Sequence, residues 1–384
     1  MIANYPTLNF DLGETADMIR DTVSSFASDH IAPIAAEIDR TDVFPRDLLP
    51  KMGELGLLGI TVEEEWGGTG LGYLEHVVAM EEISRAGASI GLSYGAHSNL
   101  CVNQLRRWGT EDQKQRYLSK LVTGEHLGAL AMSETGAGSD VVSMKLRADK
   151  KGDKYVLNGS KMWITNSPDA DTLIVYAKTE PDKASRGITA FLIERGFKGY
   201  SVAQKLDKLG MRSSDTAQIF FDNVRVPAGN LIGQEGWGFF YQMLQFQEER
   251  LWGAANMIRG LENAVSETIE YTRGRNAFGK SILDNQVVHY RLAELSTEIE
   301  ALRALTYRAT ELYVKGQDVT RLASMAKLKA GRLGREVADS CLQYWGGMGF
   351  MEETPVSRAY RDGRLGSSFF LLFLDLVVLR LLRL

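Results

Sequence analysis

The sequence predicts a multidomain α+β fold in three parts: an N-terminal helical domain at residues 1–128, a central β-barrel or β-sandwich domain at 129–238, and a C-terminal four-helix bundle at 239–384. Apolar residues recur at helical spacing in the first and last parts, whereas short β-rich segments separated by turn residues fill the middle. The chain has 384 residues, enough for two or three domains with a sizeable core, and its eight prolines are few, so long helices are plausible.

The N-terminal part is predicted to be helical at 16–39, 71–86 and 111–121, where apolar residues follow the helical period. A glycine-rich run at 67–72 invites a dinucleotide-binding interpretation. Its glycine spacing is wrong for that fingerprint and no apolar strand leads into it, so a flexible turn between helices is the preferred prediction.

The central part is predicted to be β-rich up to about residue 238. Asn158-Gly159, between apolar segments at 155–157 and 161–165, predicts a hairpin, because this pair supplies the positive φ angles of a type I′ turn. Further strands are expected at 172–177, 188–194, 218–221 and 224–226. No β-α-β alternation is visible, which argues against a nicotinamide-binding Rossmann unit.

The C-terminal part is predicted to contain long helices at 239–271, 286–315 and 319–344, which could form an antiparallel bundle. The last stretch, 367–384, is rich in Leu and Phe but short for a membrane span, and it contains Asp375, Arg380 and Arg383. Two interpretations stay open: an amphipathic helix that is buried or covered by a partner, or an altered terminus.

Composition excludes several classes of function. The formal net charge of −5 gives no reason to expect nucleic acid, and the histidines and cysteines show no metal-type spacing. Two distant thiols, Cys101 and Cys341, indicate a reducing compartment. Because residues 1–19 contain no Lys or Arg, neither a secretory nor a transit peptide is expected, and no membrane association. The expected location is the bacterial cytoplasm or, for a processed form, the mitochondrial matrix.

Two short segments carry the strongest functional signal. Small residues and hydroxyls at 130–140 let donors approach a polar ligand closely, and an aromatic residue near a hydroxyl at 161–166 suits a flat ring rich in heteroatoms. Together they resemble the flavin-binding signature of the acyl-CoA dehydrogenase family. The helical–β–helical order resembles the same family from near residue 10 to Leu365.

The segments 91–101, 139–145 and 205–212 are most similar to the isovaleryl-CoA branch of that family, whereas 343–350 is also similar to dehydrogenases of longer branched chains such as citronellyl-CoA. The resemblance implies a homotetramer that uses FAD to convert a short branched acyl-CoA thioester, such as isovaleryl-CoA, to the trans-2-enoyl-CoA and passes electrons to electron-transfer flavoprotein. The alternatives are a citronellyl-type substrate, an oxidase or related flavin monooxygenase, and a non-catalytic protein of the same fold.

The resemblance also assigns cofactor contacts. Within one subunit these are Met132, Ser133, Ser139, Trp163 and Thr165, of which the tryptophan flanks the ring and the threonine donates toward flavin N5. A second set matches residues that reach the FAD of a neighbouring subunit: Arg275, Phe278, Gln286, Gln343 and Gly347. A guanidinium suits a pyrophosphate because it can bind phosphate oxygens in a bidentate manner. Taken singly, Trp163 would be a core aromatic, the serines turn residues and Arg275 a solvated charge.

The implied reaction needs a desolvated base for the substrate's α-proton. In many family members this glutamate lies near the C-terminus, at a position that falls near Phe370 here, where there is no carboxylate. The isovaleryl branch places it on the first long C-terminal helix, immediately before an arginine, and Glu249-Arg250 matches that pattern. Without the resemblance, residues 248–250 would be a solvated helix face.

The resemblance further implies substrate contacts from Ser139, Leu92, Arg250 and Gly253. Gly253 replaces a bulkier family residue and is expected to deepen the acyl pocket, where each buried methylene is worth ~0.8 kcal/mol; Trp252 could partly refill it. The tail lacks the family's Gly-rich segment with its Glu, and 369–372 stands there instead. Weak FAD retention is the expected consequence.

Overall fold

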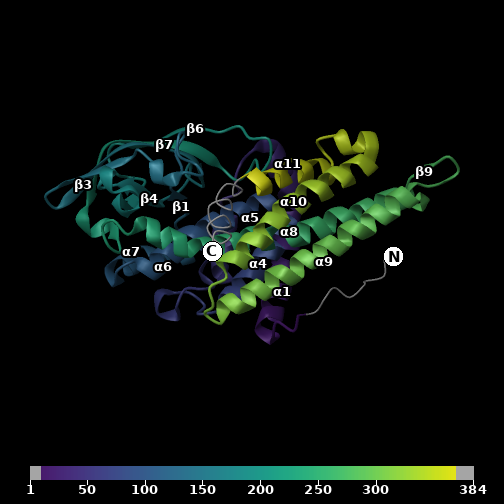
Figure 1. Ribbon diagram of the computed structural model, residues 1–384, viewed down its shortest axis with the longest axis horizontal. Coiled ribbons are helices and arrows are strands. Elements are labelled where there is room, and N and C mark those ends of the chain that lie inside the picture. The colour runs from purple at the N-terminus through teal and green to yellow at the C-terminus, as the bar shows by residue number, and fades with distance from the viewer. Residues whose placement is uncertain (1–9, 369–384) are drawn as a thin grey trace, which may run out of the picture.

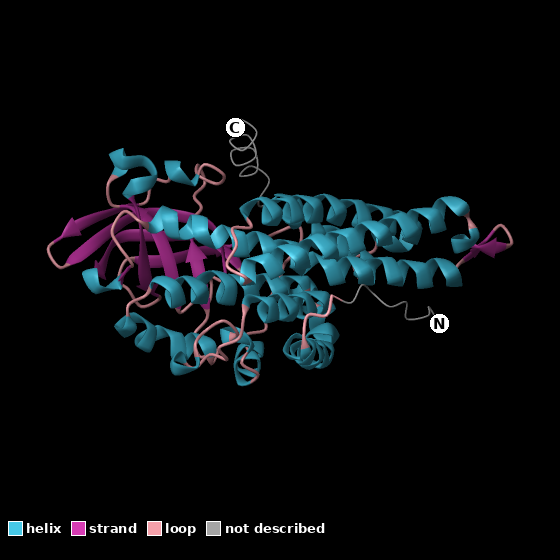
Figure 2. Cartoon of the chain, turned by 60° about the horizontal axis from the view of Figure 1, so that its bottom comes forward, coloured by secondary structure: helices cyan, strands magenta, loops and turns pink. Residues whose placement is uncertain are grey.

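The computed structural model describes residues 10–368, so the expectations for 369–384, including the position of Phe370, lie outside the described residues. The central strands lie at one end of an elongated molecule, and three long helices run from them to the other end (Figures 1 and 2). The order of a helical part, a β-sheet part and a second helical part confirms the predicted fold class.

The N-terminal part consists of short and medium helices: α1 Glu14–Phe26, α2 Ala35–Thr41, α3 Leu48–Glu54, α4 Tyr73–Ala86, α5 Ala88–Gly95, α6 Asn103–Trp108 and α7 Glu111–Val122. The single helix predicted at 16–39 is wrong in its middle. There a π-helical segment and a 3₁₀ turn separate α1 from α2, and Pro33, in the first turn of the 3₁₀ segment, has no N–H to continue an α-helical ladder.

The glycine-rich run forms a turn before α4, as predicted. Gly67 and Gly70 have φ of +87° and +64°, which suits glycine. A Cβ at Gly68 would lie 2.1 Å from the carbonyl oxygen of Val62. The glycines therefore allow close packing of the backbone, and the alternative of a dinucleotide site is not needed to explain them.

The central strands form one eight-stranded sheet in the order β6-β7-β3-β2-β4-β5-β8, with β1 paired in parallel to β4. Their bounds are β1 Gly128–Ala131, β2 Arg147–Lys151, β3 Lys154–Thr165, β4 Thr172–Lys178, β5 Ile188–Glu194, β6 Tyr200–Lys205, β7 Thr216–Pro227 and β8 Leu231–Ile232. The strands predicted at 218–221 and 224–226 are parts of one strand, β7.

The predicted hairpin at Asn158-Gly159 is wrong. Both residues lie inside β3, which continues past them because β7 pairs with it on both sides of a register shift. Asn158 Oδ1 accepts the Asn223 N–H at 2.8 Å, and Gly159 has φ +139°. The pair therefore lies opposite a β-bulge in β7, where Asn158 faces both Asp222 and Asn223. The tight turn lies earlier, between β2 and β3, at Gly152 (φ +63°).

The C-terminal part contains α8 Gly238–Gly274, α9 Gln286–Val314, α10 Thr320–Trp345 and α11 Pro355–Ser368. The first three confirm the predicted long helices. Between α8 and α9 a small hairpin of β9 Asn276–Ala277 and β10 Lys280–Ser281 lies at the far end of the bundle (Figure 1). None of the helices within residues 10–368 is long and apolar enough to cross a membrane.

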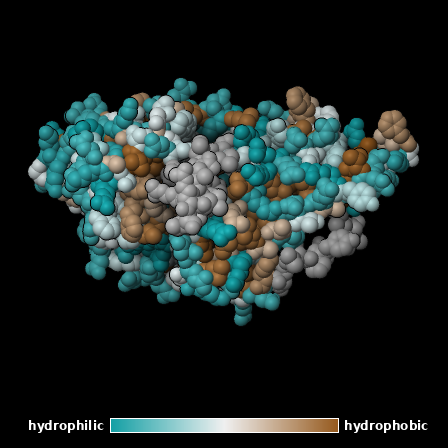
Figure 3. Space-filling model, in the orientation of Figure 1, coloured by the Kyte–Doolittle hydropathy of each residue, from teal (hydrophilic) through white to brown (hydrophobic). Residues whose placement is uncertain are grey.

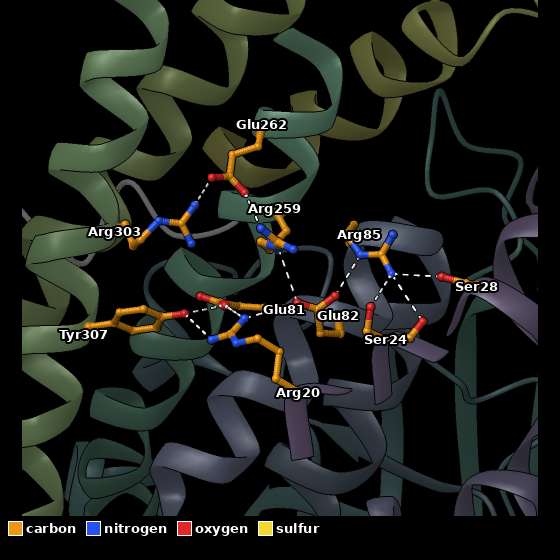
Figure 4. A network of polar contacts seen from close by, with 10 residues as sticks. All are labelled: Arg20, Ser24, Ser28, Glu81, Glu82, Arg85, Arg259, Glu262, Arg303 and Tyr307. Atoms are coloured by element: carbon orange, nitrogen blue, oxygen red, sulfur yellow. Dashed lines mark hydrogen bonds and ion pairs between the residues drawn. The ribbon is translucent and has the colours of Figure 1, made fainter. Parts of the chain in front are cut away.

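A buried ionic network joins the N-terminal helices to the bundle (Figure 4). The carboxylates of Glu81 and Glu82 on α4 have no exposed surface. Arg20 of α1 contacts both at 3.1 Å, Tyr307 of α9 donates to Glu81 at 2.6 Å, and Arg259 of α8 lies 3.3 Å from Glu82. Because losing one partner would leave a buried charge unpaired, the network fixes the place of α8 against α4.

Candidate active site

A cavity of about 710 Å³ brings together most of the residues predicted for the site. The central sheet and the loop after β1 form one wall, α5 and the segment after it form a second, and α8 crosses opposite the sheet. The predicted residues that line it are Leu92, Met132, Ser133, Ser139, Trp163, Thr165, Glu249, Arg250 and Gly253.

The sheet wall presents a tryptophan in an unusual backbone conformation. Trp163 has φ +60° at a register shift between β3 and β7, and its side chain is 42% exposed. Positive φ is uncommon for a bulky residue and persists where the surrounding structure holds it. The bulge directs the ring to the cavity instead of the core, so the interpretation of Trp163 as a core aromatic is wrong.

A buried ion pair that the sequence analysis missed holds this wall together. Lys161, with no exposed surface, donates to Glu134 Oε1 at 2.9 Å and to the carbonyl of Met132 at 2.8 Å. Glu134 also accepts the backbone N–H groups of Lys145 and Leu146. The loop that carries Met132 and Ser133 is thereby fixed to β3.

The same wall fits the ring of a flavin. An exposed aromatic face, the hydroxyls of Ser133 and Thr165 and the backbone at Met132 border one apolar cavity. Such a surface can cover a flat ring and donate to its heteroatoms. Ser133 is tied into the wall, since its carbonyl accepts the Met162 N–H at 2.9 Å.

Glu249 lies across the cavity on α8 and is 6% exposed. Burial raises the pKa of its carboxyl from 4.5 to about 7, against the opposing effects of Arg250, Lys327 and a hydrogen bond from Gln242. The Gln242 Nε2 donates to Glu249 Oε2 at 3.1 Å. A carboxylate with a pKa near neutrality is suited to general-base work.

The neighbouring carboxylate of Glu248 is engaged elsewhere. It forms an ion pair with Arg107, accepts from Tyr313 at 2.7 Å and lies 3.4 Å from Asn103 Nδ2. Both glutamates are buried, so the interpretation of 248–250 as a solvated helix face is wrong. Of the two carboxylates, Glu249 lines the cavity, whereas Glu248 is held by contacts outside it.

Gly253 lines the cavity one turn beyond Glu249, but it does not leave open space. A Cβ there would lie 2.8 Å from Lys327 Cε and 2.9 Å from its Cδ. The expected deepening at this point is therefore wrong, because the lysine stem fills the gap. Burial lowers the pKa of Lys327 to about 8, and its Nζ donates to the Gly366 carbonyl at 2.5 Å.

Two further cavity residues lie close to Glu249 on α8. The Arg250 guanidinium lies over the Phe246 ring at 5.3 Å from its centroid. Trp252 is 5% exposed and packs against Gly95, where a Cβ would lie 2.4 Å from the indole ring. Trp252 is thus held by α5, and Leu92 lies on that same helix.

The second set of predicted cofactor residues lies outside this cavity. Arg275, Phe278, Gln286, Gln343 and Gly347 are all exposed and lie around the end of the bundle that carries the β9–β10 hairpin. Phe278 is fully exposed at 104%, and hydrophobic surface appears at that end in Figure 3. Arg275 Nη1 donates to Tyr271 at 2.9 Å. One chain therefore does not bring the two sets together.

The fold and the site define a flavoprotein oxidoreductase that uses FAD. Family profiles match most of the chain: the N-terminal domain of acyl-CoA dehydrogenase at residues 13–125, its middle domain at 129–224 and its C-terminal domain at 236–369. The chain belongs to the acyl-CoA dehydrogenase family, whose members are oxidoreductases acting on the CH–CH group of an acyl-CoA.

Relatives with specific names are similar over nearly the whole chain. A mitochondrial isovaleryl-CoA dehydrogenase of Solanum tuberosum is 48% identical, with 94% of this chain and 87% of the relative covered. A mitochondrial 2-methylacyl-CoA dehydrogenase of the same plant is 47% identical, with 92% and 86% covered. The crystal structure of an acyl-CoA dehydrogenase from Geobacillus kaustophilus is 36% identical and has a TM-score of 0.95, with 98% and 100% covered.

Proposed function

We propose that this enzyme dehydrogenates a short branched acyl-CoA, with isovaleryl-CoA as its substrate and Glu249 as the base that removes the α-proton. The supporting observation is the buried Glu249 carboxylate, which lines the cavity and has a pKa of about 7, while its neighbour Glu248 is fully engaged. A second buried carboxylate of the lining, Asp362, has a pKa of about 6 and already accepts the Met211 N–H. Two relatives that are 48% and 47% identical to this chain are named for isovaleryl-CoA and 2-methylacyl-CoA, which supports a short branched acyl group as the substrate.

Desolvation gives Glu249 its strength as a base. A carboxylate in water is too weakly basic to abstract a proton next to a thioester, and removing water disfavours its charged form. Arg250 and Lys327 oppose that effect, so a substantial fraction of Glu249 is ionised near pH 7. A base whose pKa lies near the working pH is ionised in a large fraction of the molecules and is still basic enough to take up a proton.

The sheet wall would hold the cofactor through Met132, Ser133, Ser139, Trp163 and Thr165. FAD, when bound there, supplies the acceptor for the hydride that leaves the β-carbon. Trp163 would cover one face of the ring, and the Lys161–Glu134 pair would keep the Met132 loop in place. Electron-transfer flavoprotein is the proposed acceptor of the electrons.

Because the second set of FAD residues lies at the far end of the bundle, we propose that it serves a neighbouring subunit in a homotetramer. Arg275 would face the pyrophosphate, with Phe278, Gln286, Gln343 and Gly347 around it. The hydrophobic exposure of Phe278, Val287 and Phe350, at 104%, 73% and 85%, suits a surface covered by another copy.

A longer branched acyl chain, such as that of citronellyl-CoA, is the second candidate substrate. The cavity continues along α8 past Gly253, to Asn256, Gly260 and Glu267. Eighteen residues separate Glu249 from Glu267, which corresponds to ~27 Å of helix. An isovaleryl group does not need that length.

A panel of acyl-CoAs, assayed with an artificial electron acceptor and FAD-loaded protein, tests the substrate. The proposal expects the highest kcat/KM for isovaleryl-CoA. Faster turnover of citronellyl-CoA would favour the second candidate. Oxygen consumption with peroxide release would instead favour an oxidase, and turnover of none of the thioesters would favour a non-catalytic role. We propose the bacterial cytoplasm as the place of action, with the mitochondrial matrix as the alternative.

A further inference from the structure

The base receives a hydrogen bond from a residue for which the sequence analysis predicted no role. Gln242 lies seven residues before Glu249 on α8, two helical turns away, and its Nε2 donates to Glu249 Oε2 at 3.1 Å. We propose that Gln242 is a positioning residue that anchors one oxygen of the Glu249 carboxylate and favours its charged form. This inference rests on the proposed role of Glu249 as base.

Gln242 is itself held in one orientation. Its Oε1 accepts from the Tyr176 hydroxyl at 2.9 Å and from Gln104 Nε2 at 3.3 Å. Burial raises the pKa of Tyr176 well above 10, so the phenol keeps its proton and acts as the donor. With its oxygen so engaged, the Gln242 amide must present its N–H groups to Glu249.

These contacts come from three separate regions of the chain. Tyr176 is on β4, Gln104 is on α6 and Gln242 is on α8, and each is at most 1% exposed. A buried polar chain that is satisfied at each end resists rearrangement, because any unpaired member would be costly. The position of the base is therefore set jointly by the N-terminal helices, the sheet and the bundle.

The anchoring leaves the second oxygen of the carboxylate available. Within residues 10–368, Oε2 receives the Gln242 N–H and no hydrogen bond reaches Oε1. Glu248 differs, since both of its oxygens have donors. A base needs this asymmetry: one oxygen fixes the direction of the group and the other accepts the proton.

Other charged and titratable groups act on Glu249 from the surrounding elements. Arg250 on α8 and Lys327 on α10 favour its charged form, whereas Tyr176 on β4 and Tyr73 on α4 are neutral phenols whose ionisation Glu249 disfavours. Removing the Gln242 donor leaves all four in place. Because the hydrogen bond from Gln242 stabilises the charged form and lowers the pKa of Glu249, its loss should raise that pKa by about one unit.

The test is Gln242→Met, which keeps the side-chain length and removes the donor. In FAD-loaded full-length protein, the acidic limb of kcat/KM against pH should move up by about one unit, since this profile reports the free enzyme. With the pKa moved from about 7 to about 8, the ionised fraction at pH 7 falls about fivefold, and kcat should follow while KM changes little.

Gln245→Met is the matched control. Gln245 is equally buried on the same helix, but its Nε2 donates to the carbonyls of Asn99 and Leu100 at 2.7 and 3.1 Å and not to Glu249. Its pH profile should match the wild type even if its stability falls. If Gln242→Met folds poorly, Tyr176→Phe should give a smaller shift of the same sign, because it removes one of the two hydrogen bonds that orient the amide and leaves the donor to Glu249 in place.

A second readout follows the carboxyl group directly and needs no turnover. The infrared band of the protonated Glu249 carboxyl, identified by its absence in Glu249→Gln, should titrate about one unit higher in Gln242→Met. An unchanged midpoint, or an equal shift in Gln245→Met, would overturn the positioning role. If Glu249→Gln itself kept wild-type activity, the failure would lie in the proposed base instead.

Discussion

Glu249→Gln should make the protein more stable at neutral and alkaline pH, although it removes the proposed base. Burial raises the pKa of this carboxyl from 4.5 to about 7, so ionising it costs the folded state more than the unfolded chain. A shift of 2.5 units at 1.36 kcal/mol per unit amounts to about 3 kcal/mol. The amide avoids this cost and can still accept the Gln242 N–H.

The stabilisation expected for Glu249→Gln depends on pH. Because the folded pKa is raised, the contribution of Glu249 to stability is fully present below pH 4.5 and is lost as the pH rises through 7. The variant should therefore equal the wild type at pH 4.5 and exceed it by about 3 kcal/mol at pH 8.

Chemical denaturation at both pH values, with saturating FAD, measures the difference. Glu248→Gln is the control: burial raises the pKa of Glu248 too, but its replacement leaves Arg107 without a carboxylate partner, so it should lower stability at pH 8 instead of raising it. A Glu249→Gln variant that is no more stable than wild type at pH 8, or equally stabilised at both pH values, would refute the reasoning.

Two other variants test the cofactor contacts. Arg275→Ala should weaken FAD retention, seen as a lower ratio of flavin to protein absorbance after gel filtration. The melting temperature of the apoprotein should change little, because the Arg275 side chain is exposed. Full FAD retention in a stable monomer would contradict a cofactor site at the subunit boundary. Lys161→Met should lower the free energy of unfolding by about 3 kcal/mol, since it leaves Glu134 buried without its cation. The exposed Lys150→Met should change stability by less than about 0.5 kcal/mol, and equal losses would show that the buried pair has no special role.

The sequence predicted those helices and site segments that depend on a local residue pattern. The helical periods located α8, α9 and α10 to within a few residues, and the segments at 130–140 and 161–166 do meet at the cavity. Glu249 was chosen by resemblance alone, since Glu248-Glu249-Arg250 carries no local sign that two adjacent carboxylates are buried for different reasons. Their difference comes from partners such as Arg107, which is 141 residues distant from Glu248 in the chain.

The features that the sequence did not predict depend on contacts between residues far apart in the chain. Asn158-Gly159 has the composition of a turn, but β7 pairs with β3 on both sides of it, with a bulge in β7 opposite Asn158. Gly253 predicted open space in the cavity, but the side-chain stem of Lys327, from another helix, occupies that space. Lys161 and Gln242 look like ordinary strand and helix residues, and only the fold shows that their polar ends meet Glu134 and Glu249.

Anaerobic bleaching of the flavin absorbance tests the central claim most directly. Isovaleryl-CoA added to FAD-loaded wild-type protein should reduce the flavin. Glu249→Gln, with FAD bound to the same extent, should lose this reaction by at least about 10²-fold, because an amide cannot accept the α-proton. Bleaching of the variant at a near wild-type rate would show that another group is the base.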